Sequence, residues 1–224
     1  MPENLEVKAR LIDISGAEQI ALSLGARRVG LLFQRDTYFL IHPGRLKLRE
    51  FGDKTAELIY YERNELSRHR RSMFQIARCV NPDGVREILS KALGTRSVVE
   101  KKRTLYLYGS TRIHFDEVTG LGNFVEIESP IGTSVEVARR VTSFLTKRLQ
   151  LKDSDYVPGS YVDLLEAVTS NNPEKGCRAG SASFDDLVSL LFLKERNLLS
   201  PNLSHTHTLH GEYYESPSHR QEIS

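Results

Sequence analysis

The sequence is notable first for what it has little of. Its 224 residues contain no Trp and only two Cys and two Met. Its longest apolar runs, such as LVSLLFL, fall far short of the ~20 residues that a membrane-spanning helix requires. The N-terminus enters charged residues directly, without a basic stretch and an apolar leader. We therefore expect no membrane association and a cytoplasmic location.

The cysteines and the charge balance exclude further classes of protein. Cys79 and Cys177 lie far apart, and neither belongs to a Cys-x-x-Cys pair, so we predict two reduced structural thiols and no zinc or redox motif. The formal net charge is only +2, and basic and acidic residues are mixed along the chain. A dedicated nucleic-acid-binding protein uses a broad cationic face, so we expect no nucleic-acid partner.

Alternation of apolar and polar residues with a period of two is the dominant pattern, and it predicts β-strands. Turn residues such as Gly52-Asp53 and Gly109-Ser110 separate most of these segments. The segments are LEVKARL, GRLKLREF, AELIYYER, SVVEKKRTLYLY, TRIHFDEV and GNFVEIES. Helical patterns are fewer, so the predicted class is α+β with an antiparallel sheet.

Three helices are predicted between these strands. The first covers residues 15–25, where Ser15 and Glu18 have the spacing of a capping box. The second enters at Pro82 and leaves at Gly94, and the third covers residues 133–151.

The composition changes near residue 168. Residues 169–224 are rich in Ser, Asn, Pro, Gly and His, and such a segment cannot bury enough apolar surface to offset its ordering entropy. We predict a domain over residues 1–168 and a largely disordered tail over 169–224, with a short helix near 184–199. The basic cluster His69–Ser72 is interpreted as a solvated turn.

Charges are sorted by sign on the polar faces of the predicted strands. The faces at 45–49 and 101–103 carry only cations, whereas Glu126 and Glu128 share a face of carboxylates. Solvated faces usually mix the two signs to gain cross-strand pairs. A closed sheet with these faces inward would join a cationic phosphate cradle to a carboxylate site for Mg²⁺. The alternative, in which each face is simply the solvated side of a sheet, stays open.

Several segments resemble the CYTH domain, the family of triphosphate tunnel metalloenzymes. They are NLEVKAR, RLKLRE, IYYER, VEKKRTLY and, most specifically, RIHFDEVTGLGNFVEIE, and the resemblance runs from about Leu5 to Leu165. It implies a closed antiparallel eight-stranded β-barrel that forms a tunnel, with charged residues inside, apolar residues outside and helices packed around it. It also implies a triphosphate ligand handled with Mg²⁺ or Mn²⁺, because members include thiamine triphosphatases, inorganic triphosphatases and class IV adenylyl cyclases.

The resemblance assigns roles to individual positions. Residues on the metal-binding positions are Glu6, Asp116, Glu126 and Glu128. Residues on the phosphate-binding positions are Lys8, Lys47, Arg49, Arg63, Lys101, Arg103 and Arg112. Lys8 is also the catalytic candidate, as a group that orients the attacking water or acts as a base. Asn4 replaces the first acid of the opening motif and brings no charge, so we expect weaker binding of a second metal.

The leading hypothesis is metal-dependent hydrolysis of a small-molecule triphosphate, either inorganic tripolyphosphate, thiamine triphosphate or a nucleoside triphosphate. Two alternatives are a cyclase that makes cyclic AMP from ATP and a module that binds polyphosphate or nucleotide without turnover. The chain is expected to be a monomer or a homodimer.

Overall fold

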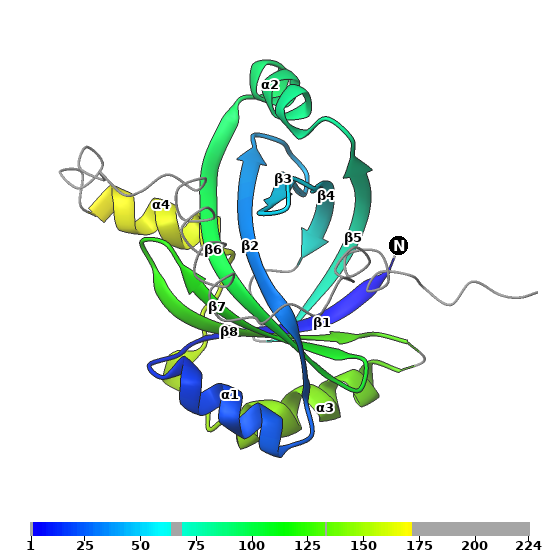
Figure 1. The fold of residues 1–224 in the computed structure, drawn as a ribbon, viewed down its shortest axis with the longest axis vertical. Coiled ribbons are helices and arrows are strands. Elements are labelled where there is room, and N and C mark those ends of the chain that lie inside the picture. The colour runs from blue at the N-terminus through cyan, green and yellow to red at the C-terminus, as the bar shows by residue number, and fades with distance from the viewer. Residues whose placement is uncertain (1, 64–68, 133, 172–224) are drawn as a thin grey trace, which may run out of the picture.

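Eight strands form the centre of the protein, which we describe from a computed structural model (Figure 1). The structure describes residues 2–63, 69–132 and 134–171. The strands are β1 (Glu3–Arg10), β2 (Arg27–Phe39), β3 (Arg45–Phe51), β4 (Ala56–Arg63), β5 (Arg70–Cys79), β6 (Thr95–Tyr108), β7 (Thr111–Val118) and β8 (Gly122–Pro130).

The strands close into one antiparallel barrel in the order β1-β5-β4-β3-β2-β6-β7-β8, which confirms the predicted fold. All six strands predicted from alternation are present. The pattern did not reveal β2 and β5. Closure gives every strand two hydrogen-bonded neighbours and leaves no open sheet edge.

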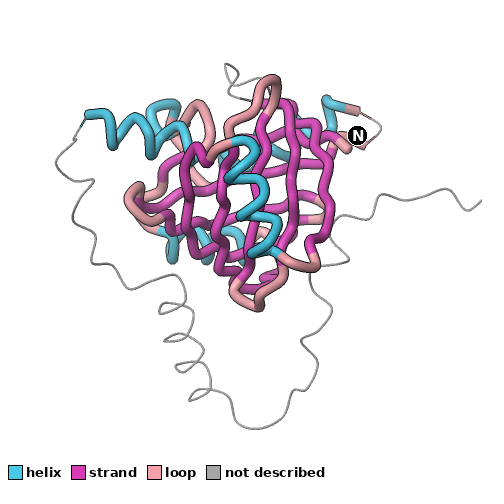
Figure 2. Tube along the Cα trace, turned by 90° about the horizontal axis from the view of Figure 1, so that it is seen from above, coloured by secondary structure: helices cyan, strands magenta, loops and turns pink. Residues whose placement is uncertain are grey.

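The helices lie outside the strands, as Figure 2 shows from a second direction. They are α1 (Ile14–Ser23), α2 (Pro82–Leu93), α3 (Val135–Arg148) and α4 (Tyr161–Asn171), with a short 3₁₀ turn, η1 (Asp153–Asp155). The predicted N-terminus of the first helix was wrong by two residues, because Asp13 and not Ser15 caps α1 by accepting from the Gly16 N–H at 3.0 Å. A capping box formed by Ser15 and Glu18 is therefore not used.

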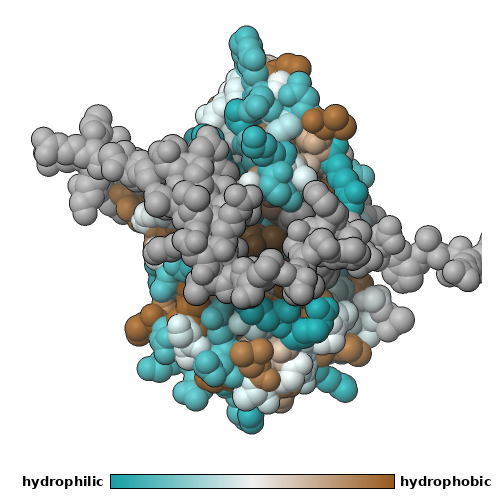
Figure 3. Space-filling view, viewed as in Figure 1, coloured by the Kyte–Doolittle hydropathy of each residue, from teal (hydrophilic) through white to brown (hydrophobic). Residues whose placement is uncertain are grey.

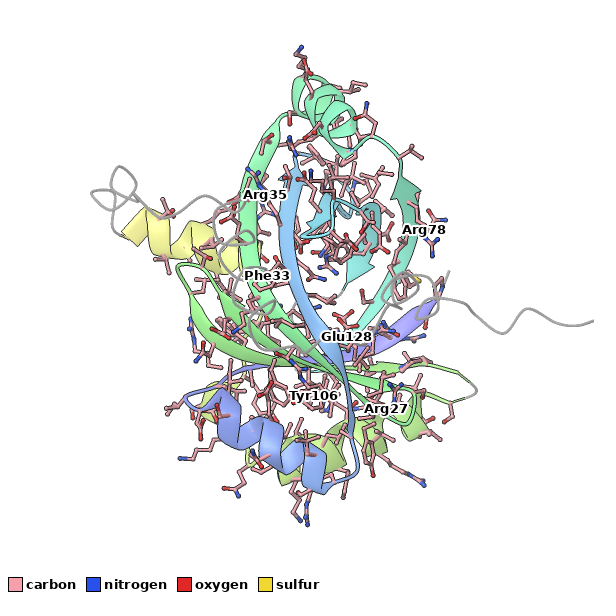
Figure 4. All side chains as sticks on the ribbon, in the orientation of Figure 1. Arg27, Phe33, Arg35, Arg78, Tyr106 and Glu128 are labelled. Atoms are coloured by element: carbon pink, nitrogen blue, oxygen red, sulfur yellow. The ribbon has the colours of Figure 1, made fainter. Side chains whose placement is uncertain are left out.

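The outward face of the barrel packs against α1 and α3. Ala17 and Ala21 of α1 and Leu145 of α3 join one buried apolar cluster. The barrel contributes outward side chains from β6, β7 and β8, among them Tyr106, Ile113, Phe115, Val125 and Ile127. In Figure 4, Tyr106 lies on the side of the sheet that faces α1 and α3, and Glu128 lies on the other side. Helix packing outside thus leaves the inward face available for charge.

The segment that leads into α4 closes part of the barrel interior. The Val157 N–H donates to the carbonyl of Lys8 at 3.1 Å, where β1 extends beyond its pairing with β5. Tyr161 and Val162 then pack among inward-facing residues, including Phe124. This part of the chain, far from β1 in sequence, therefore completes the wall of the bore.

Two predictions concern the C-terminal part of the chain and the membrane. The predicted tail, with its helix near 184–199, lies outside the described residues, and the predicted boundary at 168 falls within α4. Among the described residues, no helix is both long enough and apolar enough to cross a membrane.

The interpretation of His69–Ser72 as a solvated turn was wrong. Arg70 begins β5 and is 1% exposed, and its guanidinium donates to the carbonyls of Val157 and Gly159 at 3.2 and 3.0 Å. Ser72 is also buried. The reason is that Arg70 faces the segment before α4. The backbone carbonyls of that segment accept hydrogen bonds from the guanidinium, and these distant acceptors cannot be identified from the local sequence.

We predict that Arg70→Ala lowers the free energy of unfolding by roughly 2–4 kcal/mol, because two buried carbonyls lose charged hydrogen bonds. Arg71→Ala is the matched control. Its side chain is 57% exposed and its ion pair with Glu3 is worth less than about 1 kcal/mol. Urea unfolding followed by circular dichroism measures both, since the chain has no Trp. Equal losses in the two variants would contradict the anchoring role.

Candidate functional site

The barrel encloses a cavity of about 660 Å³, its open mouth included. Among the described side chains, six cations and four carboxylates line it, a formal net charge of +2. The cations are Lys8, Lys47, Arg49, Lys101, Arg103 and Arg112. The carboxylates are Glu6, Asp36, Glu126 and Glu128. The sorted faces predicted from the sequence therefore meet in one enclosure.

Asp36 is the centre of a cationic cluster formed by β2, β3 and β6. Its carboxylate is 1% exposed and accepts from Arg49 at 2.7 and 2.8 Å, from Lys47 at 2.9 Å and from Lys101 at 2.8 Å. We call Asp36, Lys47, Arg49 and Lys101 the cationic cradle. One negative charge is thus shared by three positive ones, so the cradle retains a net positive charge that suits a polyanion.

Burial changes the protonation of the cradle. Although burial raises the pKa of the Asp36 carboxyl, the three cations around it, Arg49 most strongly, bring that pKa well below its ordinary value. Burial and then the Arg49 charge lower the pKa of Lys47 to about 8. Burial also lowers the pKa of Lys101 well below its ordinary value. Both lysines are therefore stabilised as ammonium ions by any anion that enters the cavity.

The other three carboxylates, Glu6, Glu126 and Glu128, lie on the other wall of the cavity, on β1 and β8. Lys8 Nζ is 3.2 Å from Glu126 Oε1, and Arg103 Nη2 is 2.8 Å from Glu126 Oε2. Arg112 contacts Glu128 Oε2 through Nε at 3.0 Å and Nη2 at 2.7 Å. Two of these contacts follow the strand register, because Lys8 is the partner of Glu126 across β1 and β8 and Arg112 is the partner of Glu128 across β7 and β8.

Three acidic side chains on this wall fit a divalent cation. Glu6 and Glu128 are direct cross-strand neighbours, an arrangement of like charges that is unfavourable without a cation between or beside them. Glu126, Glu128 and His114 each place one ligand atom within 4.8 Å of the others. Burial, reinforced by Arg103, lowers the pKa of His114 to about 3, so its imidazole is neutral and able to ligate a metal at neutral pH. Oxygen donors with one imidazole suit Mg²⁺ or Mn²⁺.

Asp116 also faces inward from β7, but Arg103 and Tyr161 contact it and it does not line the cavity. It is 0% exposed, accepts from Arg103 Nε and Nη2 at 2.6 Å each, and accepts from the Tyr161 hydroxyl at 2.7 Å. The Tyr161 ring in turn lies 3.6 Å from Lys8 Nζ. In this arrangement Asp116 fixes the orientation of Arg103 and Tyr161, and its role as a metal ligand stays a prediction.

Asn4 lies in the cavity wall next to Arg112. With its amide oriented to satisfy both polar atoms, the oxygen accepts from Arg112 Nη2 at 2.8 Å and the nitrogen donates to the Glu3 carbonyl at 3.2 Å. At the position where the family motif has an acid, Asn4 is therefore a neutral hydrogen-bond acceptor for Arg112.

The other predicted site residues whose side chains the structure describes all line the cavity. Arg63 ends β4, and its side chain lies outside the described part of the chain. Prediction from sequence missed Asp36 and Tyr161. The alternation of Gln34, Asp36 and Tyr38 was the available signal for Asp36, whereas Tyr161 comes from a helix with no pattern that points to the bore.

The CYTH domain matches residues 3–161 of the chain. A comparison with curated protein sequences finds no match. Among solved structures, the chain is similar to the PH1012 protein of Pyrococcus horikoshii, with 25% identity and a TM-score of 0.66. That match covers 72% of this chain and 99% of the other.

Two further solved structures share the fold at lower identity. One is a candidate adenylate cyclase of Vibrio parahaemolyticus, with 15% identity and a TM-score of 0.60 over 73% of this chain and 97% of the other. Another is HpAC1 from Hippeastrum, a candidate adenylyl cyclase described as having a dominant triphosphatase activity. It has 14% identity and a TM-score of 0.56, and the match covers 75% of this chain and 96% of the other.

We predict that Asp36→Asn lowers the free energy of unfolding by about 3–5 kcal/mol, because it leaves three buried cations without their shared carboxylate. Added inorganic tripolyphosphate should restore much of this loss by supplying negative charge. The control is Glu117→Gln, whose half-exposed pair with Lys102 contributes less than about 1 kcal/mol. Thermal unfolding with and without tripolyphosphate measures both effects. An Asp36→Asn protein as stable as the control would overturn the role of Asp36.

Proposed function

The chain belongs to the CYTH domain family, and from this membership and the charged cavity we propose that it binds and hydrolyses a triphosphate with a divalent cation. The observation that carries the proposal is the meeting of the cationic cradle with Glu6, Glu126 and Glu128 in one enclosed cavity. Neither group alone would suit a metal–polyphosphate complex. Together they offer contacts to the phosphates and to the metal that accompanies them.

The cradle binds the phosphate chain in this proposal. Lys47, Arg49 and Lys101 contact oxygens of the phosphates and share Asp36 as a common support. Because these cations are already desolvated and held in place, they stabilise charge on the phosphoryl oxygens without reorganising as it develops. Phosphoryl transfer needs mainly this kind of positioning and charge stabilisation.

The acidic wall holds the metal in this proposal. Glu6, Glu126 and Glu128 would be its carboxylate ligands, with His114 beside them. When bound, Mg²⁺ or Mn²⁺ neutralises phosphate charge and activates a water molecule for attack. Arg103 of β6 and Arg112 of β7 contact carboxylates of this wall and would also contact the phosphates.

Lys8 acts as a hydrogen-bond donor near the reacting phosphate. Its ammonium lies 3.2 Å from Glu126 and 3.6 Å from the centroid of the Tyr161 ring. Both contacts stabilise the charged form of a lysine. We therefore assign Lys8 to orienting the attacking water or contacting a phosphate oxygen, rather than to accepting the proton.

The products separate this reaction from its alternatives. Hydrolysis of ATP with Mn²⁺ releases orthophosphate, whereas a cyclase releases pyrophosphate and cyclic AMP. A module that only binds releases neither. Incubation with ATP, thiamine triphosphate and tripolyphosphate, followed by chromatography of the products, distinguishes the three outcomes.

We predict that the double substitution Glu126→Gln, Glu128→Gln lowers kcat/KM for the best triphosphate by more than about 100-fold, since two charged metal ligands become neutral amides. Glu117→Gln, on the outward face of β7, should change it less than twofold. Phosphate release at saturating Mg²⁺ or Mn²⁺ is the measurement. Full activity in the double variant would remove the proposed metal site.

We predict that tripolyphosphate binding weakens as the pH rises through about 8. Lys47, whose pKa is about 8 in the free protein, must carry a proton to attract the anion, and it loses that proton above this pH. The affinity then falls by up to about tenfold for each further pH unit. Calorimetry without divalent cation measures this.

The control for the pH dependence is Lys47→Arg, because a guanidinium stays charged throughout this range. The variant should show a smaller decline above pH 8, while keeping the dependence that arises from Lys101 and from the ligand. Identical pH profiles for the two proteins would show that Lys47 is not the titrating group.

A further inference from the structure

One aromatic side chain in the cavity wall comes from a helix and not from the barrel. Tyr161 is the first residue of α4, is 4% exposed and lines the cavity together with Lys8. Figure 3 shows apolar, brown surface inside the hollow at the middle of the molecule, so uncharged side chains also line the interior. Tyr161 is thus an uncharged group placed among the charges of the bore.

Tyr161 contacts one partner through its hydroxyl and another through its ring. The hydroxyl donates to Asp116 Oδ2 at 2.7 Å, and Asp116 is itself held by two hydrogen bonds from Arg103. The centroid of the ring lies 3.6 Å from Lys8 Nζ. The face of an aromatic ring attracts an ammonium, most strongly where water is excluded. Tyr161 therefore connects a buried aspartate to a lysine of the cavity.

Packing holds the Tyr161 ring in this orientation. The Phe124 ring meets it edge-on, with the centroids 5.0 Å apart and an angle of 64° between the planes. Phe124 is fully buried, and so is Val162, the next residue of α4, in the same cluster. Edge-on aromatic pairs stabilise each other beyond the area that they bury. The ring is therefore fixed by Phe124 and, through its hydroxyl, by Asp116.

Ion pairs and hydrogen bonds hold the start of α4 on the barrel at the same place. Asp163 accepts from the N–H and the hydroxyl of Ser160 at 2.8 and 2.7 Å, which caps the helix. Arg45 of β3 donates to Ser160 Oγ at 2.5 Å and to Asp163 at 3.0 Å. Arg96 of β6 donates to Asp163 at 2.8 Å. These contacts fix the backbone on both sides of Tyr161.

A lysine needs such fixed neighbours, because its ammonium sits on a flexible stem of four carbons. Glu126 contacts Lys8 Nζ at 3.2 Å from β8, and the Tyr161 ring contacts it from α4. The ring holds the ammonium without adding a negative charge. It therefore leaves more of the positive charge of Lys8 for an anion than a second carboxylate would.

On this basis, and resting on the proposed function, we propose that Tyr161 is a positioning residue. Its ring holds the Lys8 ammonium in the place where the ammonium donates a hydrogen bond to an oxygen of the bound phosphate chain. The helix α4 thereby becomes part of the phosphate site, although the contact passes through Lys8.

The test is a double-mutant cycle between Lys8→Ala and Tyr161→Leu. Binding of inorganic tripolyphosphate to the full chain is measured by calorimetry in EDTA, where the proposed metal-dependent hydrolysis stops. Each single variant should weaken binding by about fivefold or more. In the Lys8→Ala background, Tyr161→Leu should weaken it by less than about twofold, because no ammonium is left to hold.

The cycle decides the proposal separately from the proposed function. Losses that multiply in the double variant, or full affinity in either single variant, would overturn the role of Tyr161 without touching hydrolysis. Because the readout is binding, absence of hydrolysis in the wild-type protein would refute the proposed function without deciding this result.

Tyr161→Phe separates the ring from the hydroxyl. It keeps the aromatic face for Lys8, so it should bind tripolyphosphate within about threefold of the wild-type affinity. A phenylalanine variant as weak as the leucine variant would overturn the role of the ring. Tyr161→Met, with a flexible apolar side chain, replaces the leucine variant if that variant does not fold.

Val162→Ala is the matched control for the packing of α4, because Val162 is fully buried beside Tyr161 and does not line the cavity. It should lower the melting temperature, since it leaves a small void, and change tripolyphosphate binding by less than about twofold. Thermal unfolding of each variant measures the first effect and calorimetry the second. If Val162→Ala weakened binding as much as Tyr161→Leu, loosening of α4 would explain both, and the proposal would be overturned.

Discussion

Each of the six cations that line the cavity in the described part of the chain contacts a carboxylate, and this pairing allows the charged face of the sheet to lie inside a barrel. An isolated buried charge costs several kcal/mol in lost hydration, which a partner at hydrogen-bond distance largely offsets. Pairs such as Lys8 with Glu126 and Arg112 with Glu128 are cross-strand neighbours. The register that closes the barrel is thus also the register that pairs its charges.

The pairing is uneven, and this imbalance of charge is what supports the proposed ligand. Around Asp36 three cations share one carboxylate, so that wall carries surplus positive charge. On the opposite wall Glu6 and Glu128 are direct neighbours of the same sign. A polyanion relieves the first imbalance and a divalent cation relieves the second. A metal-bound phosphate chain would relieve both imbalances at once. Neither charge cluster alone would therefore suggest this ligand.

The sequence predicted those strands whose two faces differ sharply in polarity. On β7 the inward Arg112, His114 and Asp116 alternate with outward apolar residues that pack on the helices, so the period of two is plain. On β5 both faces are mixed, because the inward face changes from Arg70 to Phe74 and the outward face is largely exposed. Alternation cannot reveal such a strand. Contacts such as that of Tyr161 with Asp116, across 45 residues, arise only when the barrel closes.

Asn4 shows how one neutral side chain shifts the balance between metal and anion. Arg112 already pairs with Glu128, and its Nη2 also donates to the Asn4 amide oxygen. An acid at position 4 would place two carboxylates on this arginine, which would strengthen metal binding and reduce the positive field that reaches the cavity. The amide satisfies the same hydrogen bond and adds no negative charge. In the proposed site, Asn4 therefore leaves the metal with one carboxylate fewer and leaves more of the Arg112 charge for a phosphate.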